Sequence, residues 1–265
     1  MMIVSVSNPL VREVCELQTR KKVREETGLF VAEGTHLVGE APRELLRRVY
    51  ITEAYAGSPE GSALCARLRG LTETVSETVM AKMSDTRTPQ GILAVIRQPG
   101  PAVFPGTGGL LVLERVQDPG NVGTLFRTAE AAGFEGILLD EGCADPLSPK
   151  TVRATMGAIF RLPFRVCPDL SAAVRSLSDA GYTVCAAHLA GRSLWETALP
   201  RRTAFLLGSE GSGLTEELTQ LAGCRVRIPM QGSTESLNVS VAGALLMYEH
   251  LRRALTDAPE GGREH

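Results

Sequence analysis

The chain has 265 residues, 43% of them hydrophobic and 22% charged, which is ordinary for globular protein and longer than one typical domain. The formal net charge is −2, so a nucleic acid would have to be bound by a local basic patch. The six cysteines form no CxxC pair and no histidine clusters with them, so neither a metal site nor a disulfide scaffold is expected. No stretch resembles a signal peptide or approaches the roughly 18 apolar residues of a membrane span. We therefore expect a cytoplasmic protein with no membrane partner.

A segment rich in proline and glycine, residues 97–109, separates two regions of regular patterning. Neither a helix nor a central strand tolerates that density of proline and glycine. The sequence thus predicts a first domain over residues 1–96, a linker over 97–109 and a second domain over 110–258. Proline, glycine and charge replace the apolar pattern near the end, so residues 259–265 are expected to form a flexible tail.

The first domain is expected to be a small α/β domain. A helix over residues 9–26 is indicated by proline at its start and Gly28 just past its end. Apolar runs predict strands over residues 29–32, 48–52 and 91–96, with a helix over 61–68. No convincing set of catalytic residues lies in this region.

The second domain alternates more regularly between short apolar strands and helical stretches. The predicted strands are residues 110–113, 136–139, 182–186, 204–207 and 225–228. Short, continuously apolar strands separated by helices indicate a parallel sheet covered on both faces. Ligands of such sheets bind in the loops at the carboxyl ends of the strands.

The first of three unusual loops is Asp118-Pro-Gly-Asn-Val-Gly123, between a strand and a helix. Apolar residues at helical spacing form one stripe on that helix (Val122, Leu125, Phe126, Ala129 and Ala132). Arg127 lies roughly 140° from Val122 around the helix, so it is not expected in the core. Asn121 as a simple N-cap and Arg127 as a solvated arginine remain the alternative interpretation.

The second loop, Leu207-Gly-Ser-Glu-Gly-Ser-Gly-Leu214, is rich in glycine, which lets a backbone approach a ligand closely. A phosphate would face Glu210 in the loop and Glu216 and Glu217 in the next helix, and no lysine occupies the Walker position. A cationic or neutral ligand, such as the sulfonium of S-adenosylmethionine, fits better. An ordinary loop followed by acidic helix capping is the alternative.

The third loop runs from Ile228 to Ala242 into an apolar helix. Ser236 and Asn238 are good helix caps, and capping is the simpler interpretation. However, Ser236, Asn238 and Ser240 supply more hydrogen-bonding groups than one helix start requires. The excess indicates a binding surface.

Together the three loops resemble the three motifs of the SpoU/TrmH branch of the SPOUT methyltransferases, in the same order and at similar spacing. The stretch from Asn8 through Lys21-Lys-Val-Arg24 to Gly34 is similar to the L30e-like substrate-binding domain that many members carry. The resemblance implies an α/β fold in which a small L30e-like domain precedes a parallel-sheet domain with a C-terminal trefoil knot. It also implies a homodimer with the active site at the subunit interface.

From the activity of the family, the resemblance also implies S-adenosylmethionine-dependent methylation of a ribose 2′-hydroxyl in RNA, with ribosomal RNA favoured. Its motifs assign catalytic roles to Asn121, Arg127, Glu210, Ser236 and Asn238. The cofactor would be bound by residues of the second and third motifs: Leu207, Gly208, Ile228, Met230, Ser236, Leu237 and Asn238. Because arginine is an implausible simple base, we expect Arg127 to bind the phosphate beside the target ribose, with proton removal as its second role.

RNA is expected to contact two basic groups. Arg20, Lys21, Lys22 and Arg24 form a compact cluster in the first domain, and Lys150 and Arg153 lie in a segment similar to the family. A solvated helix face is the alternative for the first cluster. Transfer RNA as substrate, a non-catalytic RNA-binding protein and an α/β enzyme acting on small molecules remain open as rival functions.

Overall fold

The computed structural model describes residues 2–100 and 102–256, which divide into two compact units. The first unit contains the described residues up to Gly100 together with the later segment Asp145–Phe160. The second contains the other described residues, 102–144 and 161–256. The segment Asp145–Phe160 therefore packs with the N-terminal residues, whereas the sequence boundaries had included it in the second domain. The tail expected over residues 259–265 lies outside the described residues.

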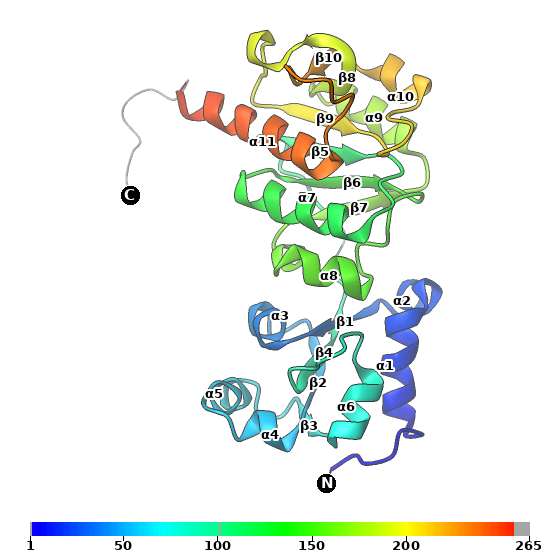
Figure 1. Ribbon diagram of the computed structural model, residues 1–265, viewed down its shortest axis with the longest axis vertical. Helices are drawn as coiled ribbons and strands as arrows, with labels where there is room; N and C mark the ends of the chain where they lie inside the picture. Colours follow the sequence, from blue (N-terminus) through cyan, green and yellow to red (C-terminus); the bar gives the residue numbers. More distant parts are fainter. Residues whose placement is uncertain (1, 101, 257–265) are drawn as a thin grey trace. The chain divides into compact units, whose positions relative to one another are not determined.

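The first unit is built around a mixed sheet in the order β1-β4-β2-β3 (Figure 1). Its strands are β1 (Leu29–Glu33), β2 (Leu46–Ile51), β3 (Thr72–Thr74) and β4 (Ile92–Arg97). Strand β4 is antiparallel to both neighbours, while β2 and β3 are parallel. The predicted small α/β domain is confirmed, and the short strand β3 is an addition to the prediction.

Helices flank this sheet: α1 (Pro9–Thr19), α2 (Lys21–Thr27), α3 (Thr35–Glu40), α4 (Glu53–Ala56), α5 (Pro59–Arg67), α6 (Glu77–Met83) and α8 (Pro149–Thr155). Apolar residues of α1 and α6 form one core cluster with β1, β2 and β4. The helix predicted over residues 9–26 is two helices, because Arg20 adopts an extended conformation between them. Helix α2 ends at Gly28, whose φ of 64° is left-handed, as the glycine indicated.

The second unit contains a six-stranded sheet in the order β10-β8-β9-β5-β6-β7, and every neighbouring pair is parallel. Its strands are β5 (Leu110–Leu113), β6 (Gly136–Asp140), β7 (Phe164–Cys167), β8 (Thr183–Ser193), β9 (Thr203–Leu207) and β10 (Cys224–Arg227). The predicted parallel sheet is confirmed. The prediction missed edge strand β7, where two of the four residues are exposed and the apolar pattern is weak.

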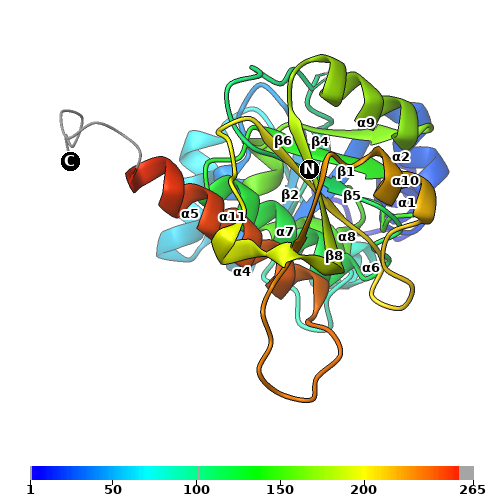
Figure 2. The same cartoon turned by 90° about the horizontal axis from the view of Figure 1, so that it is seen from above.

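Four helices of the second unit cover its sheet: α7 (Pro119–Ala131), α9 (Leu170–Asp179), α10 (Glu216–Leu221) and α11 (Val239–Thr256). Helices α9 and α10 contribute to the core cluster on one face, and α7 packs against α11 (Figure 1). The predicted stripe of α7 is buried, with Val122, Leu125, Phe126 and Ala129 fully inside. The segment between β10 and α11 forms an extended loop, orange in Figure 2.

Strand β8 departs from regular pairing beside β10. Arg225 aligns with Ala186, but the next residue, Val226, aligns with Arg192, so the residues between 186 and 192 bulge from the ladder. Just before the bulge, Cys185 and Cys224 form a disulfide between the two strands. The sequence did not predict this bridge, because the two cysteines are 39 residues apart and match no spacing pattern.

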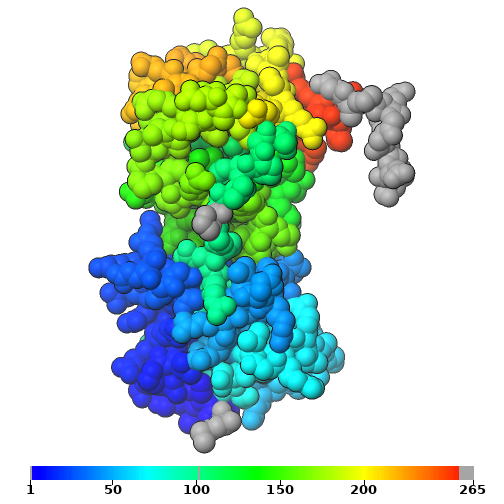
Figure 3. Space-filling view, turned by 180° about the vertical axis from the view of Figure 1, so that it is seen from behind, coloured from blue at the N-terminus to red at the C-terminus, as the bar shows by residue number. Residues whose placement is uncertain are grey.

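The proline- and glycine-rich segment after residue 101 lies at the surface of the second unit (Figure 3). It forms no helix or strand before β5. The Glu135 carboxylate accepts hydrogen bonds from the backbone N–H groups of Gly106 and Thr107, at 2.9 and 2.6 Å. The segment is thereby attached to the start of β6.

Candidate active site

The three loops singled out in the sequence follow β5, β9 and β10, at the carboxyl edge of the parallel sheet. The loops after β9 and β10 line a cavity of about 460 Å³. Six residues expected to bind the cofactor line it: Leu207, Gly208, Ile228, Met230, Ser236 and Leu237. Glu210 lines it as well, whereas Asn121, Arg127 and Asn238 do not. The sheet topology thus brings together segments that are far apart in the sequence.

Asn121 connects the three loops through a chain of hydrogen bonds. Its Nδ2 donates to Glu210 Oε1 at 2.7 Å, and its Oδ1 accepts from Asn238 Nδ2 at 3.1 Å. Both ends of the carboxamide are therefore engaged, which fixes its orientation. Three of the five residues predicted to be catalytic form this chain, one from each motif.

Helix capping, the simpler interpretation of the polar residues in the first and third loops, applies to some of them. Asp118, not Asn121, caps α7 by accepting the N–H of Asn121 at 2.9 Å. Asn238 Oδ1 accepts the Ser240 N–H and O–H, so it does cap α11. Asn238 nevertheless also donates to Asn121, so one side chain both starts the helix and joins the polar chain. Ser236 lines the cavity and has no hydrogen bond among the described residues.

Arg127 is exposed on α7, as its angle from the apolar stripe predicted. Within the described part of the chain it has neither a hydrogen bond nor an ion pair. By contrast, Arg161, which follows α8, donates to Glu130 of α7 at 2.7 Å. An exposed guanidinium with no protein partner can accept a planar anion such as a phosphate.

The residues that line the cavity fit S-adenosylmethionine. Leu207, Ile228, Met230 and Leu237 supply apolar surface for a flat base, and the loop backbones supply hydrogen-bonding groups. The carboxylates of Glu210 and Glu235 line the same cavity and favour a cation such as a sulfonium. Glu216 and Glu217 start α10 and do not line the cavity, so the sequence overestimated the number of nearby carboxylates.

Sequence reasoning missed part of the cavity wall. Ala187, His188 and Leu189, in the bulge of β8, line the cavity together with residues of the β10 loop. Arg227 also lines the cavity and is the one arginine among its described lining residues. The bulge could not be predicted, because the run Ala186 to Gly191 carries only small and apolar residues with one histidine.

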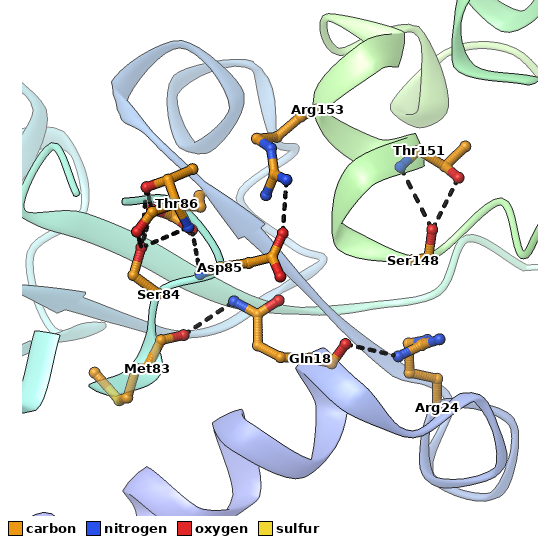
Figure 4. Close-up of polar contacts among 10 residues, drawn as sticks. Gln18, Arg24, Met83, Ser84, Asp85, Thr86, Ser148, Thr151 and Arg153 are labelled. Atoms are coloured by element: carbon orange, nitrogen blue, oxygen red, sulfur yellow. Dashed lines mark hydrogen bonds and ion pairs between the residues drawn. The ribbon is translucent and has the colours of Figure 1, made fainter. Parts of the chain in front are cut away.

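The residues expected to bind RNA fall into two groups within the first unit. Arg20, Lys21 and Lys22 are exposed, and each forms an ion pair one helical turn away, with Glu16, Glu25 and Glu26. Arg24, in contrast, is buried and donates to Asp145 at 2.6 Å and to the Leu17 carbonyl. Figure 4 shows its further contact with the Gln18 carbonyl. Its inclusion in an exposed basic cluster was wrong, because the break at Arg20 turns Arg24 toward the interior.

In the second group, Lys150 is exposed on α8 and Arg153 is half-buried on the same helix. Arg153 donates to Asp85 at 2.6 Å, between α8 and the loop before β4 (Figure 4). That loop is held by Glu33, which accepts the hydroxyls of Ser84 and Thr86. Arg153 therefore has a structural partner in the protein.

We also searched the described residues for a metal site, a membrane-spanning helix and a nucleophilic cysteine. No group of three or more His, Cys, Asp or Glu among them could hold a metal ion. No helix in that part of the chain is long and apolar enough to cross a membrane. Burial raises the pKa of the Cys143 thiol to about 12, and its Sγ donates to the Leu113 carbonyl. Cys143 is thus a packed thiol and not a nucleophile.

Comparison with known proteins gives two family matches. Residues 109–248 match the SpoU rRNA Methylase family, and residues 8–94 match the MRM3-like substrate binding domain. The first match covers all three loops of the site. The second covers the sheet of the first unit up to β4.

The chain is similar over nearly its full length to individual members. It is 34% identical to the 23S rRNA (guanosine(2553)-2′-O)-methyltransferase RlmP of Bacillus subtilis, over 94% of this chain and 98% of RlmP. The structure of an AdoMet-bound rRNA methyltransferase from Sinorhizobium meliloti superimposes with a TM-score of 0.82, at 34% identity, over 96% and 98% of the two chains. The SpoU methyltransferase AviRb from Streptomyces viridochromogenes shares the fold, with a TM-score of 0.84 at 23% identity over 95% and 100%.

Proposed function

The chain belongs to the SpoU rRNA methylase family, and from that premise we propose that it methylates one ribose 2′-hydroxyl of ribosomal RNA. It is an S-adenosylmethionine-dependent RNA 2′-O-methyltransferase. The observation that carries the proposal is the hydrogen-bonded chain Glu210–Asn121–Asn238 at the edge of the cofactor cavity. When bound, the cofactor supplies a methyl group on a positively charged sulfur.

The side chains of the site have separate tasks in this proposal. Leu207, Gly208, Ile228, Met230, Ser236, Leu237 and Asn238 hold the cofactor. Asn121 and Glu210 orient the ribose, because the carboxamide is fixed at both ends and cannot swing away. Arg127 binds the phosphate beside the target ribose through its free guanidinium, and its second role is in removal of the hydroxyl proton. Ser236 contributes a hydroxyl at the cavity wall.

We further propose a homodimer formed through α11, with the active site at the subunit interface. Val241, Leu245, Tyr248 and Leu255 are exposed by 37–65% and follow each other at intervals of four, three and seven residues. Side chains at this spacing lie along one side of the helix and form an apolar stripe. Helices that pack against a partner helix typically carry such a stripe. The same proposal includes the trefoil knot of the family and a cytoplasmic location.

Exposed Arg20, Lys21, Lys22 and Lys150, with Arg153, are proposed to contact RNA phosphates from the first unit. The match to a substrate-binding domain over residues 8–94 supports this role. Transfer RNA is the second candidate substrate, because the family acts on both kinds of RNA. Mapping 2′-O-methyl sites in total RNA from cells with and without this protein tests the choice. Loss of one site in 23S rRNA is expected, and loss confined to a tRNA would overturn the ribosomal assignment.

A further inference from the structure

Arg115 has an unusual backbone conformation at the carboxyl edge of β5. Its φ is 52°, in the left-handed region that disfavours residues with a side chain, and only Met156 shares this among described non-glycine residues. A glycine would adopt the same conformation without strain. The sequence therefore keeps an arginine where the backbone favours a glycine.

Surrounding contacts hold this backbone firmly. The Arg115 N–H donates to Asp140 Oδ1 at 2.9 Å, and the Glu114 N–H donates to the Leu207 carbonyl at 2.9 Å. The Glu114 carboxylate in turn accepts the N–H and O–H of Thr215 at 2.7 and 2.8 Å. Strained residues persist where their neighbours over-determine them, and such residues cluster at functional sites.

The contacts that the Arg115 side chain makes with other described residues do not explain why an arginine occupies this position. Its closest carboxylate oxygen, Glu114 Oε2, lies 4.0 Å from a terminal nitrogen and already accepts from Thr215. The Nε of Arg115 is buried and has no acceptor among the described residues. The Arg115 side chain as a whole is 42% exposed. One donor therefore lacks a partner while the guanidinium remains accessible.

Arg115 also lies in the segments that build the active site. It lies in the connection between β5 and α7, six residues before Asn121 in the first turn of α7. Its neighbour Glu114 holds Thr215, which caps α10 directly after the loop carrying Glu210. The carboxylates of Glu114 and Asp140 would oppose an anion, but both already accept hydrogen bonds from the protein.

We propose that Arg115 binds a backbone phosphate of the RNA strand that carries the target ribose. This inference rests on the proposed function and adds a residue that the family motifs do not assign. A planar guanidinium matches a phosphate with two parallel N–H donors, and here the exposed terminal N–H groups, not the buried Nε, would meet the phosphate oxygens. Arg115 follows β5 (Leu110–Leu113) at the carboxyl edge of the sheet, where substrates of parallel sheets bind.

The test compares Arg115→Gly and Arg115→Lys with the wild type on an unmodified 23S rRNA transcript. Gly removes the cation and the strain together, so its unfolding temperature should equal or exceed that of the wild type. We expect its Kd for S-adenosylmethionine to stay within twofold. Its RNA affinity should fall roughly five- to tenfold, and the slope of log K against log salt concentration should become shallower by about 0.7–0.9 units. Lys should keep the slope and show a smaller decrease in affinity.

A matched control is Arg175→Ala, which removes one exposed cation from α9 that already pairs with Glu217 at 3.4 Å. Its RNA affinity and salt slope should match the wild type. Wild-type affinity and slope in Arg115→Gly would overturn the inference, as would unfolding or loss of cofactor binding in both Arg115 variants. Failure of the wild type itself to bind or methylate the transcript would instead refute the ribosomal RNA function on which the inference rests.

Discussion

At the scale of single residues, Arg127 is the clearest functional candidate, because it is exposed and has no protein partner among the described residues. Arg127→Ala should fold normally and bind S-adenosylmethionine with little change, since it leaves both the α7 stripe and the cavity wall intact. Methyl transfer should fall about 100-fold or more, equivalent to roughly 2.7 kcal/mol of transition-state stabilisation. Single-turnover rates and calorimetric titration with the cofactor measure the two effects. Wild-type turnover in this variant would leave Arg127 as a solvated helix residue.

Arg127→Lys separates the two roles of this side chain. A lysine can meet a phosphate as a point charge, so part of the activity should remain with an unchanged pH optimum if phosphate binding dominates. If the residue removes the proton, activity should instead follow the lower pKa of lysine and the optimum should shift. The pH–rate profile of this variant decides between them.

Candidate site residues could be assigned one by one from the sequence, because each motif is continuous along the chain. Asn121, Glu210 and Asn238 were assigned individually and form one hydrogen-bonded chain. Arg24 was misassigned because exposure depends on the helix break at Arg20, which no residue type in the run signals. Arg115 was overlooked because a left-handed backbone is invisible when the residue is not glycine.

At the scale of elements, α11 is predicted to form the subunit interface. Replacing both Leu245 and Tyr248 with Glu places charges on the exposed apolar stripe, and both side chains are accessible enough that the fold should survive. We expect sedimentation to show a monomer where the wild type is a dimer, with activity abolished in parallel. Ala254→Glu, at an exposed position of the same helix outside the stripe, serves as a charge control. An unchanged dimer in the double variant would exclude this face.

The C-terminal part of α11 also predicts a dependence of stability on pH. Hydrogen bonds from Arg252 and Arg253 lower the pKa of the buried Glu249 to about 2, from an ordinary value of 4.5. Its stabilising contribution is therefore present above pH 4.5 and is lost as the pH falls from 4.5 toward 2. Glu249→Gln should cost about 1–3 kcal/mol at pH 7 and progressively less in that acid range. Chemical denaturation of both proteins at several pH values measures this difference, and a constant difference would contradict it.

Helix α2 carries the remaining basic cluster. Lys21→Ala combined with Lys22→Ala should reduce the salt dependence of RNA binding by roughly one unit of slope for each phosphate that the variant no longer binds. Each lysine already pairs with a glutamate, so Glu25→Gln with Glu26→Gln is a useful companion variant that should strengthen binding. An unchanged slope in the lysine variant would make α2 a solvated helix face.

Elements with strong apolar periodicity were predictable, and those shaped by tertiary context were not. Strand β5 has the predicted bounds, and the α7 stripe is buried as expected. Edge strand β7 and the bulge in β8 escaped prediction, because exposed or irregular pairing leaves no clean alternation in the sequence. The disulfide between Cys185 and Cys224 depends on that pairing and was equally hidden.

At the scale of the whole molecule, the chain order and the structural units differ. The two units divide after Gly100, within the proline- and glycine-rich segment 97–109. However, Asp145–Phe160 packs with the N-terminal residues, where Arg24 binds Asp145 and the Phe30 and Phe160 rings lie 6.2 Å apart. The order of residues along the chain could not reveal such an excursion, because the segment has the same helical patterning as its neighbours.

The most direct test of the central claim is the chemical identity of the product. The purified protein is incubated with an unmodified 23S rRNA transcript and S-adenosylmethionine carrying a labelled methyl group, without added transition metal. The RNA is then digested to nucleosides and separated by mass. We predict that the label appears in a single 2′-O-methylated nucleoside, and that Arg127→Ala removes it. Label on a base instead of the ribose, or no transfer to any RNA while the cofactor binds, would contradict the claim.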